Sequence, residues 1–227
     1  MISVITPTSD RGFAFALCEQ WMKRQTIKPD EWIVVDSGHR PVITTLGQKH
    51  ILTKQNLSPT IDFLLNVKTG LLQAKFDKIL FIEDDDWYSP TYLEEMSALL
   101  DYHELVGQRP ARYYHLHSGS FKIFPNDYHA SLSQTGIKNS MVLQMLSHIH
   151  DLKKTCDKYL DMRLWIFGSN KKLVEKYSSV GIKGLVGKKG LGDGHNPNSM
   201  LYKDSIDKTT LKNWIGDDLA FYYSVNQ

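Results

Sequence analysis

Cysteine is scarce in this sequence: Cys18 and Cys156 are the only two among 227 residues. So small a number excludes a disulfide-stapled scaffold and favours a reducing compartment. No apolar run approaches the roughly 18 residues that a membrane-spanning helix requires, so we expect no membrane span. Residues 1–8 are apolar but short and lack a basic start, which argues against a signal peptide. We therefore expect a cytoplasmic protein.

A strong charge of either sign is also missing. Lys and Arg number 27 against 25 Asp and Glu, a net charge of +2, which neither requires nor excludes a nucleic-acid partner. No G-x-x-x-x-G-K-[ST] motif follows the first predicted strand, and the cluster at residues 187–192 lacks that spacing, which excludes a P-loop ATPase. With 41% hydrophobic residues, a chain of this length forms one globular domain with a proper core.

The most informative stretch that is present runs from residue 78 to residue 90. Four apolar residues at 79–82 predict a short buried strand, and they lead directly into Glu83, Asp84, Asp85 and Asp86. Crowded carboxylates repel one another unless a cation lies among them, and oxygen ligands suit Mg2+ or Mn2+. The alternative is that these acids cap a helix beginning near Pro90. Four acids in a row at a strand end favour the metal or phosphate interpretation.

Strands and helices alternate along the first hundred residues, as in an α/β fold. Strands are predicted at residues 2–6, 32–36, 50–53 and 78–82, and helices at 13–24, 58–74 and 90–102. This spacing is typical of βαβ units with parallel strands. Ligands of open α/β sheets bind outside the carboxyl ends of such strands. Three polar strand ends should meet at that edge: Pro7-Thr8, Asp36-Ser37 and Glu83-Asp84-Asp85-Asp86.

The second half has a different pattern. Residues 112–117 and 120–124 predict an antiparallel pair, residues 138–149 and 155–165 predict helices, 180–186 a strand, and 207–223 a helical tail. Five glycines then fall within residues 184–194. Glycine at this density indicates a mobile or close-approach loop.

Three segments taken together resemble the family-2 type glycosyltransferases with the GT-A fold, phage-borne relatives included. They are the opening strand with Pro7-Thr8-x-x-Arg11, the Val-Val-Asp36-Ser-Gly segment, and Phe-Ile-Glu-Asp-Asp-Asp at residues 81–86. The likeness covers residues 1–100 well and the remainder loosely. It implies an α/β fold: one GT-A-like domain over residues 1–227, with an open, twisted, mainly parallel sheet flanked by helices. Residues 1–103 would form the nucleotide-sugar half, and residues 104–227 a small antiparallel and helical acceptor half.

The resemblance also implies a nucleotide-sugar donor, typically a UDP-sugar, and Mn2+ or Mg2+ as the cofactor. The metal would be held by Asp84, Asp85 and Asp86, although pairing Glu83 with Asp85 fits the D-x-D spacing equally well. Asp84 would also approach the ribose or sugar. The donor-binding residues carried over are Pro7, Thr8, Arg11, Asp36, Ser37, Lys68 and Asp84. Lys68 lies where many relatives carry an Arg-Asn pair, and for Arg11 a solvated side chain at a helix start is an equal alternative to a phosphate contact.

A late histidine is the further candidate ligand. His195 follows Gly192-Asp-Gly, and imidazole is a reasonable ligand for Mn2+. The alternative is an ordinary polar loop residue. We predict that residues 186–196 order over the donor diphosphate and exclude water from the reactive sugar centre.

Inverting members of the family use a carboxylate from the second half as the general base, within hydrogen-bond reach of the acceptor hydroxyl. Asp161, four residues before Trp165, resembles the acidic residue of that segment, with Asp157 in reserve. The alternative for Asp161 is a solvated helix position near Arg163. Aromatic residues form either an acceptor wall or core: Tyr113, Tyr114, His115, His117, Trp165 and Tyr222.

Three functions stay open at this point. The first is a metal-dependent glycosyltransferase acting on a glycan, a lipid-linked sugar or a small molecule. The second keeps this chemistry but transfers the sugar to a hydroxymethylated base in DNA, as in phage-type DNA modification in the host cytoplasm. The third is a nucleotide-binding module without turnover, nucleotidyltransferase-like or degenerate.

Overall fold

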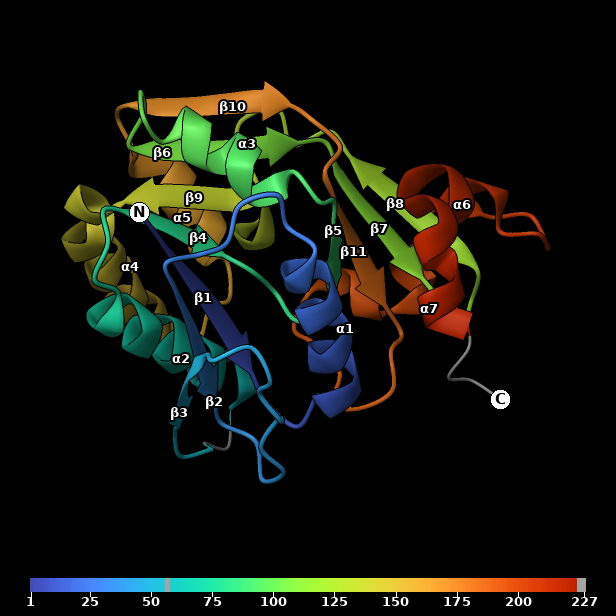
Figure 1. Ribbon diagram of the computed structural model, residues 1–227, viewed down its shortest axis with the longest axis horizontal. Coiled ribbons are helices and arrows are strands. Elements are labelled where there is room, and N and C mark those ends of the chain that lie inside the picture. Colours follow the sequence, from blue (N-terminus) through green and yellow to red (C-terminus); the bar gives the residue numbers. More distant parts are fainter. Residues whose placement is uncertain (56–57, 224–227) are drawn as a thin grey trace.

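The computed structural model describes residues 1–55 and 58–223, and they form two β-sheets with helices packed around them (Figure 1). The larger sheet has the strand order β10-β6-β9-β4-β1-β2-β3. Strand β9 runs antiparallel to both of its neighbours, and every other pair in the sheet is parallel. Its strands are β1 (Ile2–Thr8), β2 (Glu31–Asp36), β3 (Lys49–Leu52), β4 (Lys78–Phe81), β6 (Leu105–Arg109), β9 (Thr135–Lys138) and β10 (Lys171–Glu175).

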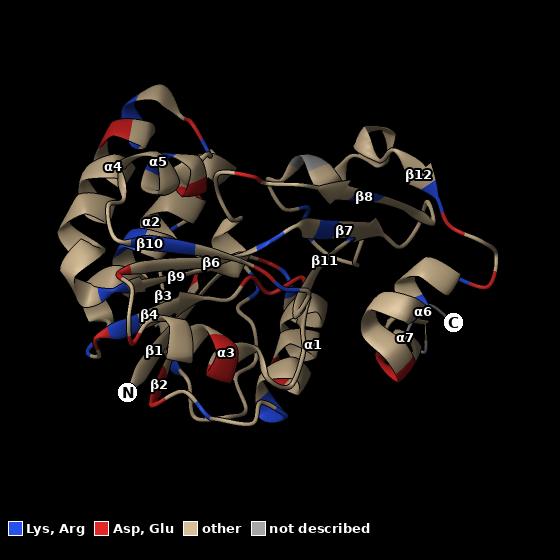
Figure 2. Cartoon of the chain, turned by 90° about the horizontal axis from the view of Figure 1, so that it is seen from above, with Lys and Arg blue, Asp and Glu red and all other residues tan. Residues whose placement is uncertain are grey.

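The smaller sheet has the order β12-β8-β7-β11-β5 and is mainly antiparallel, with a parallel β7–β11 pair. Figure 2 shows the two sheets beside each other, with acidic and basic segments gathered where they meet. Both sheets draw strands from both sides of residue 103. The strands of the smaller sheet are β5 (Asp86–Tyr88), β7 (Ala111–His115), β8 (Ser120–Phe124), β11 (Ser179–Lys183) and β12 (Tyr202–Lys203).

Helices cover both faces of the larger sheet. Side chains alternate along a strand, so Val4 and Ile5 of β1 enter two different hydrophobic clusters. The Val4 cluster contains α1 and α3 and continues to the smaller sheet, whereas the Ile5 cluster contains α2, α4 and α5. The helices are α1 (Gly12–Lys23), α2 (Pro59–Gln73), α3 (Tyr92–Leu99), α4 (Val142–Thr155), α5 (Leu160–Phe167), α6 (Thr209–Ile215) and α7 (Leu219–Tyr223). None of the helices in the described chain is both long and apolar enough to cross a bilayer.

Helix α2 lies unusually close to the sheet. It begins where the Ser58 hydroxyl accepts from Ile61 N, with Pro59 in its first turn. Gly70 allows the close contact, because a Cβ there would lie 2.4 Å from Cγ2 of Ile5. This packing brings the amino-terminal half of α2 to the carboxyl ends of β1 and β2.

The α/β class and the mainly parallel sheet are confirmed, and several boundaries differ from the prediction. Strands β5, β6, β9, β10 and β12 were not predicted. The helix predicted from residue 138 begins at Val142, because Lys138 belongs to β9. The helix predicted over 155–165 is interrupted, since Cys156 adopts a left-handed conformation that ends α4. Gly216, with φ of 61°, divides the helical tail in the same way.

Candidate active site

A cavity of about 300 Å3 opens at the carboxyl ends of β1 and β4, within the size range of small-molecule sites. One wall comes from the β1–α1 turn, α2 and the acidic segment, and the opposite wall from the smaller sheet and the start of α5. Residues 188–192 of the glycine-rich loop also line it. The cavity therefore joins the two halves of the chain.

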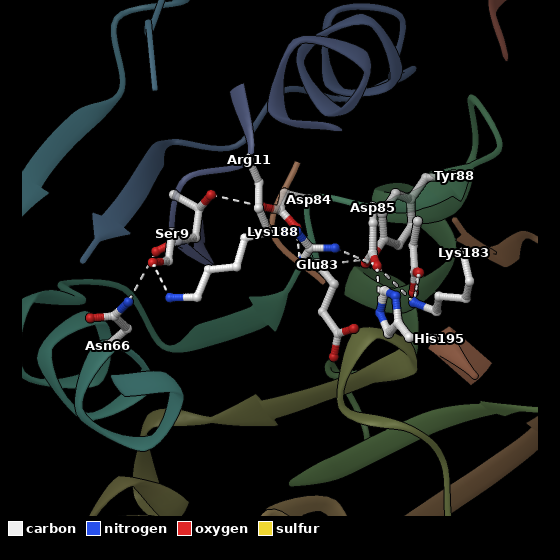
Figure 3. Close-up of polar contacts among 12 residues, drawn as sticks. Ser9, Arg11, Asn66, Glu83, Asp84, Asp85, Tyr88, Lys183, Lys188 and His195 are labelled. Carbon is white, nitrogen blue, oxygen red and sulfur yellow. Dashed lines mark hydrogen bonds and ion pairs between the residues drawn. The ribbon is translucent and has the colours of Figure 1, made fainter. Parts of the chain in front are cut away.

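Glu83, Asp84 and Asp85 of the acidic segment line the cavity, and Figure 3 shows the polar contacts around them. Strand β4 ends at Phe81, and the backbone turns at Asp84 and Asp85 before β5 begins at Asp86. Asp84 accepts a hydrogen bond of 2.6 Å from the Thr8 hydroxyl. The Arg11 guanidinium spans two carboxylates, with Nη1 2.8 Å from Asp84 Oδ1 and Nη2 2.5 Å from Asp85 Oδ2. Arg11 therefore pairs with the acidic segment and is not a solvated side chain at the start of α1.

A buried lysine approaches the same acids from the other sheet. In the β5–β11 pair, Asp86 lies opposite Gly181, so Lys183 is two residues further along the same face of β11. Its ammonium lies 2.8 Å from Asp86 Oδ1 and 3.1 Å from Asp85 Oδ2. His195 Nε2 lies 3.1 Å from the same Asp85 oxygen. The structure thus brings His195 to the acidic segment, as the sequence predicted.

Burial and mutual repulsion raise the pKa values of three of the four acids. Burial raises the pKa of Glu83 to about 8, and nearby Asp86 adds to this effect. Burial likewise raises the pKa of Asp84 to about 6, although Arg11 opposes it. Asp86 also has a raised pKa, again mainly because of burial, with Lys183 opposing. The cluster therefore holds protons strongly when no further cation is near.

Asp85 behaves differently from its neighbours. Burial alone would raise its pKa, but Arg11, Lys183 and His195 together hold it well below the usual range. The Lys183 pKa is raised, because Asp85 and Asp86 outweigh the cost of burying the ammonium. Asp85 is thus the ionised centre of the cluster.

The donor set fits a hard divalent cation. Carboxylate oxygens of Glu83, Asp85 and Asp86 lie within 4.8 Å of one another. Asp85 Oδ1 is buried and accepts no hydrogen bond from any described residue, which leaves an oxygen for a metal ligand bond. A metal at these carboxylates would share its ligands with Lys183. Lys183 was not predicted from the sequence as a site residue. Asp84 is not in this group and instead contacts Arg11 and Thr8.

The predicted donor residues divide into three groups. Pro7, Thr8 and Ser37 line the cavity beside Arg11 and Asp84. Asp36 is buried and does not belong to the described lining; its carboxylate accepts hydrogen bonds from Gly38 N and Val42 N and so fixes the loop after β2. Lys68 is exposed on α2 and also lies outside that lining.

Asn66, two residues before Lys68 on α2, lines the cavity in which Lys68 was expected to bind the donor. It donates hydrogen bonds to Thr8 O and Ser37 Oγ, at 3.2 and 3.1 Å. Its amide thereby ties α2 to two strand ends. Helical spacing offered a signal, because Asp62 and Asn66 are four residues apart on one face of α2 and both line the cavity.

The glycine-rich loop lies across the cavity and contacts the β1–α1 turn. Lys188 donates from its backbone N to Asp10 O at 3.3 Å and from Nζ to Ser9 Oγ at 3.0 Å. Gly190 packs so closely on the His195 ring that a Cβ there would lie 2.2 Å from Nε2. The loop places the Lys188 and Lys189 side chains on the cavity wall.

Asp161, in the first turn of α5, also lines the cavity. Its Oδ1 accepts from Met162 N at 2.9 Å, and burial raises the pKa of the carboxyl. Tyr113 lines the same cavity and its hydroxyl lies 2.8 Å from Ser131 Oγ. Other residues of the suggested acceptor wall pack into the hydrophobic core, namely Tyr114, Trp165 and Tyr222. Asp157 does not belong to the described lining.

Solved structures with a similar fold were found. S. aureus TarS matches with a TM-score of 0.54 and 15% identity, over 80% of this chain and 36% of that chain. The 1–349 portion of S. aureus TarS in complex with UDP-GlcNAc matches with a TM-score of 0.54 and 14% identity, over 96% of this chain and 66% of that chain. This chain thus spans less than two-thirds of the length of either neighbour. No protein-family model and no curated protein matches the sequence. These neighbours show that the fold is GT-A-like, the fold of glycosyltransferases.

Proposed function

We propose that this protein is a glycosyltransferase that transfers a sugar from a nucleotide-sugar, a UDP-sugar by preference, to an acceptor hydroxyl. One observation carries the proposal: a single cavity is lined both by the acidic segment with Arg11 and by Asp161 of α5. Such a cavity offers separate places for a leaving diphosphate and an attacking hydroxyl. The UDP-GlcNAc complex of TarS, a structure of the same fold, supports the choice of donor class.

The donor end has the charges that a diphosphate needs. Arg11, Lys188 and Lys189 line it, and arginine and lysine are the usual protein partners of phosphate oxygens. Pro7, Thr8 and Ser37 would contact the nucleoside, with Asn66 fixing the strand ends beneath it. The Lys188 contact with Ser9 holds the loop over this end, where it excludes water from the sugar centre.

A divalent cation, Mn2+ or Mg2+, completes the proposed site. Glu83, Asp85 and Asp86 would hold it, with His195 beside Asp85. Its contribution when bound is to stabilise the negative charge that grows on the departing nucleoside diphosphate. Lys68 and Asp36 have no direct donor role in this proposal, because neither belongs to the described lining.

Asp161 is the proposed general base at the acceptor end. A carboxylate there would accept the proton of the acceptor hydroxyl as that oxygen attacks the anomeric carbon, which gives an inverting reaction. Its raised pKa brings a carboxyl closer to the range in which proton transfer is efficient at neutral pH. The cavity that Asp161 lines is also lined by Tyr113, Phe124 and Tyr159, and such aromatic faces suit a sugar ring or a base.

The test needs no acceptor, because glycosyltransferases with bound donor transfer the sugar slowly to water. Thermal stability is measured with Mn2+ and UDP-, GDP-, CMP- or dTDP-sugars, followed by release of the free nucleotide. We expect one donor class to raise the unfolding free energy by about 2 to 3 kcal/mol at a hundredfold excess over its dissociation constant. Asp85→Asn should reduce hydrolysis about a hundredfold. Asp77→Asn, on an exposed acid with a 3.9 Å contact to Lys138, is the matched control.

Failure takes two distinct forms. Absence of a thermal shift with every donor contradicts the nucleotide-sugar site. A shift without hydrolysis indicates the nucleotide-binding module instead of an enzyme. Acceptor classes are then compared with the preferred donor, using glycans, small hydroxylated molecules and duplex DNA containing hydroxymethylated bases; salt-dependent retention on DNA accompanies only the last.

A further inference from the structure

The ammonium group of Lys183 lies inside the acidic cluster instead of at its rim. The residue is 3% exposed, and Nζ contacts Asp86 Oδ1 at 2.8 Å and Asp85 Oδ2 at 3.1 Å. These two carboxylates are also two of the three in the group whose oxygens lie within 4.8 Å of one another. Lys183 therefore pairs with two of the carboxylates that a divalent cation would require.

An ammonium and a divalent ion exclude each other here for reasons of size and charge. Mg2+ bonds to oxygen at about 2.0 to 2.1 Å and tolerates little deviation from its preferred geometry. An ammonium 2.8 and 3.1 Å from the same carboxylates would be a like charge at contact distance in a site largely removed from water. The cluster accepts one of the two cations at a time.

A purely structural role explains the buried lysine poorly. Buried ion pairs contribute little net stability compared with apolar residues of the same volume, because both charges lose their hydration. Lysine is almost never fully buried unless it is paired, so the burial of Lys183 depends on Asp85 and Asp86. The Lys183 side chain is, however, well placed to move, since it ends β11 and is followed by Gly184 with φ of 79°.

We propose that Lys183 is a tethered cation that competes with a divalent ion for Asp85 and Asp86, so that the ion binds only as the ammonium moves away. Free of donor, the cluster is neutralised by Lys183 and Arg11 from within the chain. The proposal rests on the metal site of the proposed function, but its test uses no donor. In this role, Lys183 makes the metal affinity of the site lower than that of the same carboxylates without a competing ammonium.

The same movement is coupled to the glycine-rich loop. A Cβ on Gly194 would lie 3.3 Å from Lys183 Cγ, so Gly194 packs directly on the lysine stem. His195 follows at once and contacts Asp85. Displacement of the Lys183 side chain therefore removes the packing contact under Gly194, the residue directly before His195.

The experiment measures Mn2+ binding to the donor-free protein, using the electron paramagnetic resonance signal of free Mn2+. Lys183→Met should bind Mn2+ at least tenfold more tightly than wild type, because the competing charge is gone. Lys183→Arg keeps the charge and should stay within about threefold of wild type. Lys203→Met, on an exposed lysine of β12 in the same sheet whose Nζ donates to Ser118 O, is the matched control and should also remain near wild type.

Equal or weaker Mn2+ binding by Lys183→Met overturns the proposal. Asp85→Asn added to Lys183→Met must abolish the tight site; retained tight binding places the ion elsewhere and also overturns it. Should Lys183→Met be too unstable for titration, Lys183→Gln is purified in Mn2+ and its melting temperature is compared with and without EDTA. The proposal requires a larger Mn2+-dependent increase than in wild type, and an equal increase contradicts it.

The outcomes separate this inference from the proposed function. A lysine-dependent Mn2+ affinity without any nucleotide-sugar hydrolysis supports the competition and contradicts the transferase. Metal-stimulated hydrolysis with an Mn2+ affinity that does not depend on Lys183 supports the transferase and contradicts the competition.

Discussion

Arg11 Nη2 lies 2.5 Å from Asp85 Oδ2, and this ion pair joins the turn after β1 to the turn after β4. The carboxylate is 1% exposed and the guanidinium 15%, so solvent screens the pair little. Because Arg11 also binds Asp84, a single guanidinium pairs with two adjacent acids. Its loss should affect folding as well as any ligand bound there.

Arg11→Met should lower the free energy of unfolding by about 3 kcal/mol at neutral pH, because two buried carboxylates lose their partner. Urea denaturation followed by tryptophan fluorescence measures the change. Arg40→Met, at an exposed position, should change stability by less than about 0.5 kcal/mol. A loss of the same small size for Arg11→Met would show that the ion pair is not a stabilising contact.

Asp161→Asn should reduce kcat for sugar transfer by about 10² to 10⁴, the usual contribution of a general base. Donor affinity should stay constant, since the acidic segment is untouched. Asp157→Asn tests the reserve candidate and should leave kcat within about twofold, because Asp157 is outside the described cavity lining. Larger loss of kcat in the Asp157 variant would reverse the assignment of the base.

The raised pKa of Asp161 predicts the pH dependence of the reaction. A base must be ionised, so kcat/KM should rise with pH through the Asp161 pKa, and burial moves this limb above the range of a free aspartate. The pH profile of Asp161→Asn should lack the limb. An acid limb that persists unchanged in the variant assigns it to another group.

Stability should follow the same ionisation with a defined sign. A carboxyl whose pKa is higher in the folded state costs stability once it ionises, and the cost develops as pH rises from the unfolded pKa, about 3.9, to the folded one. Asp161→Asn should therefore be more stable than wild type at pH 7, and the gain should vanish as pH falls below about 4. Urea midpoints at the two pH values measure it. A gain that is equal at both values contradicts the burial of this charge.

Two glycines of the loop provide a matched pair. Gly190→Ala should lower kcat/KM about tenfold or more, because the new Cβ would lie 2.2 Å from His195 Nε2 and push the ring from Asp85. Gly192→Ala should stay within about twofold, as its Cβ meets only His195 Cδ2 at 4.0 Å. Initial rates and urea midpoints of both variants separate a local effect from unfolding. Equal activity of the two variants would remove His195 from the proposed mechanism.

The strand ends that line the cavity could be predicted from the sequence, because their signals are local. A buried strand followed directly by Glu83 and three Asp is a continuous pattern, and parallel strand order then places Thr8 and Ser37 at the same edge. The GT-A-like fold followed from the same segments and is confirmed. The family-2 assignment and a phage origin stay predictions.

Lys183 could not be predicted from the sequence, because its position depends on long-range pairing. The residue is 97 positions from Asp86, and it reaches the acids only through the pairing of β11 with the three-residue strand β5. So short a strand, hidden within the acidic motif and the aromatic residues after it, has no periodicity to detect. Lys68 was suggested by its charge, but it is exposed and outside the described cavity lining, whereas the Asn66 amide donates to Thr8 O and Ser37 Oγ.

Asp85 and Asp86 are consecutive residues, yet they belong to different parts of the architecture. The chain leaves the larger sheet at Phe81 and enters the smaller one at Asp86. The distances among these carboxylates therefore depend on how the two sheets are placed relative to each other. An acceptor that moved the sheets apart would increase these distances, and one that drew the sheets together would shorten them. In the proposed transferase, an acceptor that moved one sheet relative to the other would thereby also act on the carboxylates proposed to hold the metal.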